Sequence, residues 1–440
     1  MFQRALSLWA FRRASNAMSD HAIASAPAGR TEDVGSPDDR TCVLYLDVEG
    51  GWGGSSRSLY YLVEALDRSV FEPIVLLRKA GPVEERYRAI GVDCRVMPEI
   101  PSFRPGDRKN AIAFMLYAWK LRKLRSLLGR LAPMVAERDI RLLHINHESL
   151  ALTGAFIARR FDLPWIGHVR TLLTPGWFAR RVHRLMARTA SHVIFITEPN
   201  RAHFRMLSGN RFAAERTSVV HNIIPIPDEA AQPLPELSDP PGRFRVLSLT
   251  NFSPSRGVDR IVDVAEALQR RGETRFAFYM CGQPALTSAL TGRAAPYYES
   301  IVSRADRSGL TDMVYFPGHV REPERALAAC DALIKLTRQA NPWGRDIIEA
   351  LAAGVPVLTL GSFEDFVANG VNGFIDETFD AERMADHLVA LADSPEMRGS
   401  MQDANRQKAR MLFDGEARAR DVAEIYRSVL SGARAAEAVG

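Results

Sequence analysis

Cysteine is scarce in this sequence. Four cysteines occur among 440 residues, and no two of them form a CxxC pair. This spacing argues against a structural zinc site and against a disulfide framework, so we expect a reducing compartment, the cytoplasm. The sequence also lacks any run of eighteen apolar residues, which argues against a transmembrane helix.

Several ligand-binding motifs are missing as well. The chain contains no Asp-x-Asp triplet and no HExxH motif, so we expect neither a bound metal nor a metal-dependent sugar-nucleotide site. There is no Gly-Lys-Ser/Thr sequence and hence no Walker loop, and we expect no cofactor. The formal net charge is +5. This is too small for a dedicated nucleic-acid-binding protein, but it leaves anionic ligands and an anionic membrane surface open.

The length and composition predict two globular domains. Hydrophobic residues make up 46% of the chain and charged residues 25%, as is usual in soluble proteins, and the chain is too long for one typical core. Residues 1–40 are rich in Ala, Ser, Gly and Pro, so we expect a disordered extension or, over Met1–Met18, a basic amphipathic helix. The sequence leaves open whether Met1 or Met18 is the true start.

After this extension, apolar segments alternate with helical ones, the pattern of a parallel sheet with crossover helices. The alternation covers residues 41–225, stops in a linker over 226–243 that is rich in Pro, Asp and Glu, and restarts over 244–413. We also expect a C-terminal helix over 414–440, and the sequence leaves open whether it crosses back to the first domain. We therefore predict an α/β fold with two Rossmann-like domains facing a central cleft, where the carboxyl ends of the strands bind ligand.

The most informative segment is Asn341–Leu358, NPWGRDIIEALAAGVPVL. Its Gly344 opens a helix of strong helix formers that Gly354 ends. The unpaired N–H groups at such a helix start suit a diphosphate, and we assign Gly344 and Arg345 to a donor site. The Glu349 carboxylate, about one turn inside, suits the paired hydroxyls of a ribose. A surface helix with a solvated Glu349 is the structural alternative.

Two glycine turns come earlier in the chain. Gly53 and Gly54 lie between the first expected strand and helix, where the backbone can approach a phosphate or sugar closely. Ser56 stands in place of a third glycine, which argues against a dinucleotide site. The corresponding turn of the second domain carries Asn251 and Arg256, and Arg256 is placed to pair with a diphosphate. A structural turn and a surface arginine are the alternatives.

Further candidates follow expected strands. His168 and Arg170 end an apolar strand, at the floor of the expected cleft; a packed histidine that only satisfies its own hydrogen bonds is the alternative. Ser362 lies in an expected loop over Leu360–Phe374, downstream of the Glu349 helix. We expect this loop to present backbone N–H groups to the same ligand, with a plain surface loop as the alternative.

Taken in this order, these residues resemble glycosyltransferase family 4, the retaining enzymes of the GT-B fold that include bacterial polysaccharide glycosyltransferases. The resemblance extends from about Val43 to about Leu430. The matching elements are the double-glycine turn with Arg57, His168, Thr197-Glu198, His221-Asn222, Arg256-Gly257, Gly282, Gly318 and the run from Glu349. The resemblance implies that the second domain binds the nucleotide, that the first domain binds the acceptor, with Arg170 as a contact, and that His168 touches the donor sugar.

The sequence departs from the family at three positions. Asn341 stands where the family usually has a glutamate, and an amide cannot offer negative charge to a developing cation. Asn251 and Arg256 stand in place of the usual phosphate-binding arginine and lysine, so the diphosphate site keeps one of two cations. These changes leave the donor preference open. We assign catalysis to His168, Arg256 and Asn341 and assign no general base.

The resemblance therefore implies metal-independent, retaining transfer of a sugar from a nucleoside diphosphate donor to a saccharide or lipid-linked acceptor, in cell-surface polysaccharide or glycolipid synthesis. The alternatives are another GT-B enzyme, such as an epimerase or phosphorylase, and a noncatalytic nucleotide-sugar-binding protein, which Asn341 motivates. Basic helices with bulky apolar residues over Arg108–Leu128 and Trp177–Arg188 predict peripheral contact with an anionic membrane, at the inner face of the cell membrane. Packing of both helices on the sheet is the alternative.

Overall fold

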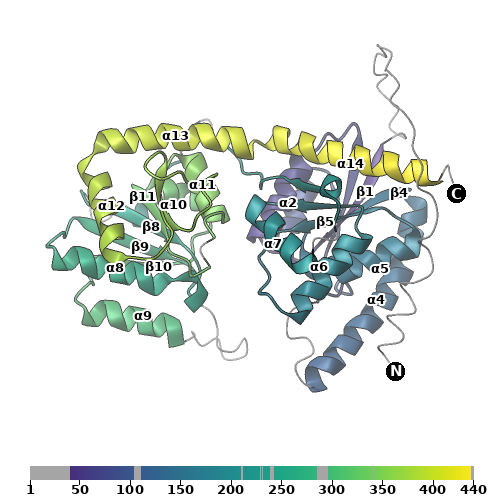
Figure 1. Ribbon diagram of the computed structural model, residues 1–440, viewed down its shortest axis with the longest axis horizontal. Coiled ribbons are helices and arrows are strands. Elements are labelled where there is room, and N and C mark those ends of the chain that lie inside the picture. Colours follow the sequence, from purple (N-terminus) through teal and green to yellow (C-terminus); the bar gives the residue numbers. More distant parts are fainter. Residues whose placement is uncertain are drawn as a thin grey trace, which may run out of the picture. The chain divides into compact units, whose positions relative to one another are not determined.

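The structure is a computed structural model (Figure 1) that describes residues 40–103, 111–209, 212–227, 229, 231–237, 242–284, 296–339 and 341–437. The described residues all belong to one compact unit, which begins at Arg40. The expected N-terminal extension, with its amphipathic helix and the choice between Met1 and Met18, lies outside the described residues. So does Arg108 at the start of the first basic segment.

The first half of the described chain contains a seven-stranded parallel sheet in the order β3-β2-β1-β4-β5-β6-β7. Its strands are β1 (Thr41–Asp47), β2 (Phe71–Leu77), β3 (Asp93–Val96), β4 (Ile140–Ile145), β5 (Trp165–Val169), β6 (His192–Phe195) and β7 (Thr217–Val219). The central strands are almost continuously apolar and buried, as parallel strands covered on both faces must be.

Helices cover both faces of this sheet. They are α2 (Gly54–Ala65), α3 (Pro82–Ala89), α4 (Ala111–Glu137), α5 (Ala151–Phe161), α6 (Trp177–Thr189) and α7 (Glu198–Ser208). Apolar residues of α4, α5, α6 and α7 share one core cluster with the sheet. Those of α2 and α3 share the other, which also includes residues of the C-terminal helix.

The second half contains a six-stranded parallel sheet in the order β10-β9-β8-β11-β12-β13. Its strands are β8 (Phe244–Leu249), β9 (Phe276–Cys281), β10 (Val314–Gly318), β11 (Ala332–Lys335), β12 (Val357–Leu360) and β13 (Gly373–Asp376). Its helices are α8 (Val258–Arg270), α9 (Pro296–Arg307), α10 (Pro323–Ala328), α11 (Arg345–Ala353), α12 (Ala381–Asp393) and α13 (Pro395–Phe413). The expected α/β fold with two Rossmann-like sheets is confirmed, while the domain boundaries at 225 and 243 stay predictions.

The helix α14 (Gly415–Glu437) follows α13 but contacts α2 and β4 of the first half. Its Tyr426 is fully buried among residues of β1 and β2. The last helix is therefore part of the core of the first sheet, and Figure 1 shows it beside β1 and β4.

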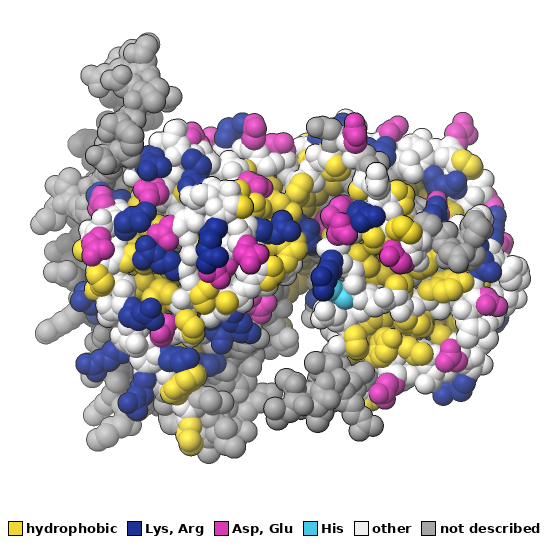
Figure 2. Space-filling view, turned by 180° about the vertical axis from the view of Figure 1, so that it is seen from behind, with side chains coloured by type: hydrophobic (Ala, Val, Ile, Leu, Met, Phe, Trp, Pro, Cys, Tyr) yellow, Lys and Arg dark blue, Asp and Glu magenta, His cyan; other side chains and the backbone are white. Residues whose placement is uncertain are grey.

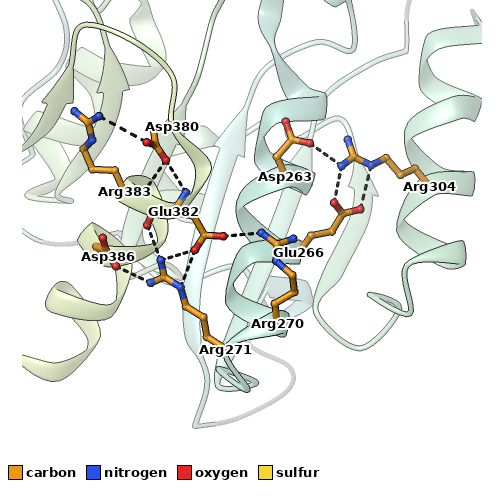
Figure 3. A network of polar contacts seen from close by, with 9 residues as sticks. All are labelled: Asp263, Glu266, Arg270, Arg271, Arg304, Asp380, Glu382, Arg383 and Asp386. Carbon is orange, nitrogen blue, oxygen red and sulfur yellow. Dashed lines mark hydrogen bonds and ion pairs between the residues drawn. The ribbon is translucent and has the colours of Figure 1, made fainter.

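Ion pairs tie the outer helices of the second half to α8 (Figure 3). Arg270 at the end of α8 and Arg271, which follows it, pair with Glu382 of α12 at 2.6 and 2.5 Å. Arg304 of α9 pairs with Glu266 of α8 at 2.6 Å. These groups are largely exposed, so each pair adds little to stability and mainly fixes how the helices pack on one another.

Candidate functional site

A cleft of about 1940 Å³ is lined by residues of both halves. Most of the residues expected at the site line it, and they are Gly54, Arg170, Asn251, Arg256, Asn341, Gly344, Arg345 and Glu349. They follow β1, β5, β8 and β11, because the carboxyl ends of parallel strands meet at one edge of each sheet. Gly53, His168 and Ser362 are not among the residues that line it.

The start of α11 is built for a close approach. Gly344 is its N-cap and has no side chain that could cap the helix, and in the first turn Oδ1 of Asp346 accepts a hydrogen bond of 3.0 Å from the backbone N–H of Ile347. A Cβ at this position would lie 1.9 Å from Nζ of Lys335, so a side chain here would displace that lysine. The helix ends at Gly354, which has a left-handed φ of 76° and closes it as the sequence predicts.

Lys335 is a residue of the site that we did not predict from the sequence. It ends β11, lines the cleft, and its Nζ lies 2.6 Å from Oδ1 of Asp346 in the first turn of α11. Both side chains are mostly buried, at 4% and 12% exposure. A lysine at the carboxyl end of an otherwise apolar strand was the signal available in the sequence. The pair places a cation directly beside the helix start.

The carboxylate of Glu349, which we expected to bind a ribose, already has two partners within the protein. Its Oε1 accepts a hydrogen bond of 3.0 Å from Nε of Arg345 and forms an ion pair of 2.9 Å with Nη2 of Arg57 on α2. Burial lowers the pKa of the Arg345 guanidinium, while Glu349 opposes that effect. Both contacts fall on Oε1, and Glu349 is among the residues that line the cleft.

Arg345 has further contacts in the first half. Its Nη1 donates to Oγ of Ser58 at 2.9 Å and to the carbonyl of Ile223 at 3.3 Å. Its guanidinium also lies over the ring of Tyr61, 5.5 Å from the centroid. Arg345, which we expected to bind the donor, thus contacts residues of both halves. The sequence placed Arg57 in the double-glycine turn, but it did not predict that Arg57 would contact Glu349 or that Tyr61 would contact Arg345.

The turn after β8 carries the other expected cation. Arg256 is exposed at the end of a short 3-10 helix, and no ion pair to it occurs among the described residues. The following Gly257 has a φ of 66°, and a Cβ there would lie 2.0 Å from the carbonyl oxygen of Leu336, so this tight turn requires glycine. Arg256 is therefore available to an anionic ligand.

The two expected asparagines are already hydrogen-bonded within the protein. Oδ1 of Asn251 accepts from the backbone N–H of Gln283 at 3.0 Å. Oδ1 of Asn341 accepts from the hydroxyl of Thr337 at 2.7 Å. The amide nitrogens of both residues are the groups that remain for a sugar or phosphate oxygen.

His168 and Ser362 lie outside the cleft lining. His168 is 4% exposed, and its Nδ1 lies 3.3 Å from Nη2 of Arg170. Arg170 continues to the cleft, donating from Nε to Oδ1 of Asn146 at 2.8 Å and from Nη1 to Oδ1 of Asn222 at 2.5 Å. Ser362 is exposed and follows the end of β12 by two residues.

The expected loop after β12 needs a correction. Gly373 and Phe374, which we expected in a loop, begin the edge strand β13, which pairs with β12 from Val357 to Leu360. Phe374 stacks on the ring of His387 at 4.2 Å. The segment GFID is too short to show strand alternation, and packing on α12 decides its structure.

The described residues contain neither a cluster of metal ligands nor a membrane-spanning helix. No group of three or more His, Cys, Asp or Glu side chains is arranged to hold a metal ion in that part of the chain. No helix there is long and apolar enough to cross a bilayer.

Family models and known proteins match this geometry. Residues 53–223 match the model described as Glycosyl transferase 4-like domain, and residues 235–408 match Glycosyl transferases group 1. Glycogen synthase of Mycobacterium tuberculosis is 23% identical over 410 residues, which cover 87% of this chain and 92% of that protein. Mannosylfructose-phosphate synthase of Agrobacterium fabrum is 25% identical over 173 residues, 38% of this chain and 37% of that protein.

Solved structures share the fold. Anabaena HepE in complex with UDP and glucose has a TM-score of 0.70 at 20% identity and covers 88% of this chain and 99% of its own. Sucrose-phosphate synthase from Thermosynechococcus elongatus has a TM-score of 0.69 at 17% identity, with 89% and 100% covered. The expected GT-B fold is confirmed. With both family models matched in order along it, the chain is a glycosyltransferase of the GT-B type.

Proposed function

We propose that this protein transfers a sugar, with retention at the anomeric carbon, from a nucleoside diphosphate sugar to a saccharide or lipid-linked acceptor. The observation that carries the proposal is the start of α11. There, α11 begins at Gly344, which has no side chain to cap it, and Lys335 and Glu349 line the cleft beside it. Arg256 lines the same cleft from the turn after β8. The diphosphate would bind at the helix start and the ribose at Glu349.

Bond cleavage leaves negative charge on the departing diphosphate. Arg256 and the helix start are fixed positive groups that stabilise this charge as it develops, which speeds the reaction more than ground-state binding does. Lys335 lies near the site as well, but the carboxylate of Asp346, 2.6 Å away, balances its charge. Arg256 is thus the cation that we expect to act on the diphosphate. The proposal needs no metal ion for this step.

The donor base is taken from the relatives as a first candidate. Anabaena HepE has been solved with UDP and with UDP-glucose. We therefore place UDP-sugars first in a thermal-shift screen that also includes GDP- and ADP-sugars. A ligand that binds the folded state raises the melting temperature. At a ligand concentration a hundred times Kd, it adds about 2.7 kcal/mol to the free energy of unfolding. A flat response to every nucleotide would remove the basis of the proposal.

The first half offers a surface for a lipid-linked acceptor. On α4, Met115 and Trp119 are 68% and 52% exposed, and on α6 Trp177 is 57% exposed. Nζ of Lys123 lies 3.9 Å from the ring of Trp119, and the guanidinium of Arg181 lies 5.2 Å from that of Trp177. Basic groups beside exposed aromatic rings suit the headgroup region of an anionic membrane.

Other residues of both helices pack on the sheet, as in the structural alternative. Leu124, Leu127 and Leu131 of α4 and Met186 of α6 are buried in the core. The exposed residues are therefore those that packing does not use. The face seen in Figure 2 mixes basic and acidic side chains, so attraction would come from these local clusters and not from a uniform field.

Sedimentation with vesicles tests this part separately. The wild-type chain should sediment with anionic vesicles at low salt and less at high salt, and the W119A/W177A variant should sediment less. Equal sedimentation with neutral vesicles would argue against the electrostatic contact. No sedimentation at low salt would favour a soluble acceptor, and with it a cytoplasmic enzyme that is not at the membrane face.

A noncatalytic nucleotide-sugar-binding protein is the second candidate, because Asn341 lacks a charge and its Oδ1 already accepts from Thr337. Slow hydrolysis of the donor distinguishes the two. An enzyme releases free nucleoside diphosphate with water as acceptor, whereas a binding protein raises its melting temperature with the donor but releases none.

A further inference from the structure

The wall that the first half contributes to the cleft carries arginines and no carboxylate. The arginines of this half that line the cleft are Arg57, Arg86 and Arg170. Among the described residues of the first half, no aspartate or glutamate lines it. Fixed charge of one sign along a cleft attracts ligands of the opposite sign. The availability of each arginine to a ligand therefore decides what this wall can bind.

Two of the three arginines are already engaged within the protein. Nη2 of Arg57 lies 2.9 Å from Oε1 of Glu349. Arg170 is buried and donates hydrogen bonds to the side chains of Asn146 and Asn222, at 2.8 and 2.5 Å. Neither guanidinium can turn to a new ligand without losing these contacts, so both mainly hold the shape of the wall.

Arg86 has no such partner in the part of the chain that the structure describes. It lies on α3, it is exposed, and no ion pair to it occurs among the described residues. Its guanidinium lies over the ring of Trp52, 3.9 Å from the centroid, and Trp52 also lines the cleft. A cation–π contact holds the guanidinium by its charge, so its N–H donors remain for an anionic ligand.

The turn that carries Trp52 is tightly packed. A Cβ at Gly50 would lie 2.0 Å from the carbonyl oxygen of Lys79, and one at Gly81 would lie 2.3 Å from that of Gly50. The turns after β1 and β2 therefore touch backbone to backbone, which leaves no room for other residues at these glycines. The ring of Trp52 also packs edge-on against that of Tyr60, with 5.4 Å between the centroids. Trp52 is thus a fixed support for the guanidinium that lies over it.

We propose that the acceptor carries an anionic group, a carboxylate or a phosphate, and that Arg86, positioned by Trp52, binds it. The planar fork of a guanidinium matches the oxygens of both groups. The proposed function places the charge of the donor, its diphosphate, at α11 and Arg256 of the second half. Arg86 belongs to the half that the resemblance assigns to the acceptor. The inference rests on the proposed function, because it requires sugar transfer in the cleft.

Matched acceptors test the charge directly. Each set contains a neutral aryl hexoside, the aryl glycoside of the corresponding uronic acid and the hexoside 6-phosphate, in the gluco, galacto and manno series. With the donor found by the nucleotide screen, the wild-type chain should show a kcat/KM roughly tenfold or more higher for an anionic acceptor than for its neutral counterpart. Preference for the uronates or for the phosphates supports the inference in either case and identifies the anion.

Two arginines of α3 provide matched variants. R86M removes the charge and should raise KM for the anionic acceptors roughly ten- to a hundredfold, the scale of a lost charge-assisted hydrogen bond. KM for the neutral acceptors should stay within about twofold of wild type, because they offer Arg86 no charge to bind. R88M removes an exposed arginine of the same helix that pairs with Glu84 and does not line the cleft, so it should keep the wild-type constants for both classes.

A third variant tests the support. W52L keeps the charge of Arg86 but removes the ring beneath it, so KM for the anionic acceptors should rise less than in R86M. An unchanged KM for these acceptors in W52L would remove Trp52 from the inference.

The acceptor kinetics also define what would overturn the role of Arg86. Wild-type preference for the neutral acceptors, or transfer to no anionic member of the sets, would do so. So would an R86M variant with unchanged KM for the anionic acceptors or with equal losses for both classes. A matching loss of donor hydrolysis in R86M would place Arg86 at the donor instead.

Failure of the proposed function is distinguishable from failure of this inference. A wild-type chain that releases no nucleoside diphosphate in water, without any acceptor, lacks the proposed activity. Release in water without a preference for anionic acceptors contradicts the inference alone.

Discussion

Glu349 should stabilise the folded protein by far more than an ordinary glutamate does. In E349A, the guanidinium groups of Arg57 and Arg345 lose the carboxylate oxygen that both contact, at 2.9 and 3.0 Å. All three side chains are 10–14% exposed, so water does little to replace it. Removing one partner of a buried pair costs about 3–5 kcal/mol.

This cost translates into a melting temperature. For a domain of about 150–250 residues, each kcal/mol shifts Tm by about 2–4 °C, so E349A should melt about 6–20 °C lower. Scanning calorimetry is the suitable assay because it resolves separate transitions in a chain with two sheets. R57M should lower Tm less, since Glu349 keeps its contact with Arg345.

The control is E364A, which removes an exposed carboxylate from the same half. Its Tm should stay within about 2 °C of wild type, as is usual for surface substitutions. If E349A and E364A melted at the same temperature, the two arginines would not depend on Glu349, and the carboxylate would be free for other partners.

Three further perturbations follow from the same geometry. R256A should lower kcat more than donor affinity, because charge on the diphosphate grows during the reaction; loss of affinity with kcat intact would restrict Arg256 to ground-state binding. Burial, and next Arg216, lower the pKa of His192 from 6.5 to about 4, so the folded state binds this proton less readily than the unfolded state. The contribution of His192 to the free energy of unfolding should be fully present above pH 6.5 and should be lost, by roughly 3 kcal/mol, as the pH drops towards 4. In denaturant titrations, the free energy of unfolding of H192Q should therefore fall less over this pH range than that of wild type. E382A, in the exposed network of Figure 3, should lower Tm less than E349A; an equal shift would mean that the network contributes more than surface ion pairs usually do.

The sequence predicted the strands that are long and apolar. β1, β2, β8 and β9 are apolar runs of six or seven residues, and such runs carry the alternation of apolar and helical segments from which the two sheets were predicted. β7, TSV, and β13, GFID, were missed. Both are edge strands of three or four residues, too short for a period, and contacts with neighbouring elements determine their structure.

The candidate site could be predicted where it lies within one motif. The helix begins after Gly344 and ends at Gly354, as predicted, and Glu349 lies about one turn inside it. The partners of Glu349 could not be predicted, because Arg57 belongs to the other sheet, and the contact of Arg345 with Ser58 spans 287 positions of sequence. Only the folded chain brings such residues together.

The sequence also could not decide whether His168 is a packed histidine or a residue of the site. Its contacts with His144 and Arg170 depend on the pairing of β4 with β5, which brings residues 24 positions apart in the sequence together.

The central claim is that the cleft binds a nucleoside diphosphate sugar and cleaves it. The most direct measurement is release of free nucleoside diphosphate from a panel of UDP-, GDP- and ADP-sugars by the full-length wild-type chain, with R256A measured in parallel. The account predicts release from at least one donor, undiminished by EDTA and strongly reduced in R256A. No release from any donor that raises the melting temperature, or release that EDTA abolishes and manganese restores, would contradict it.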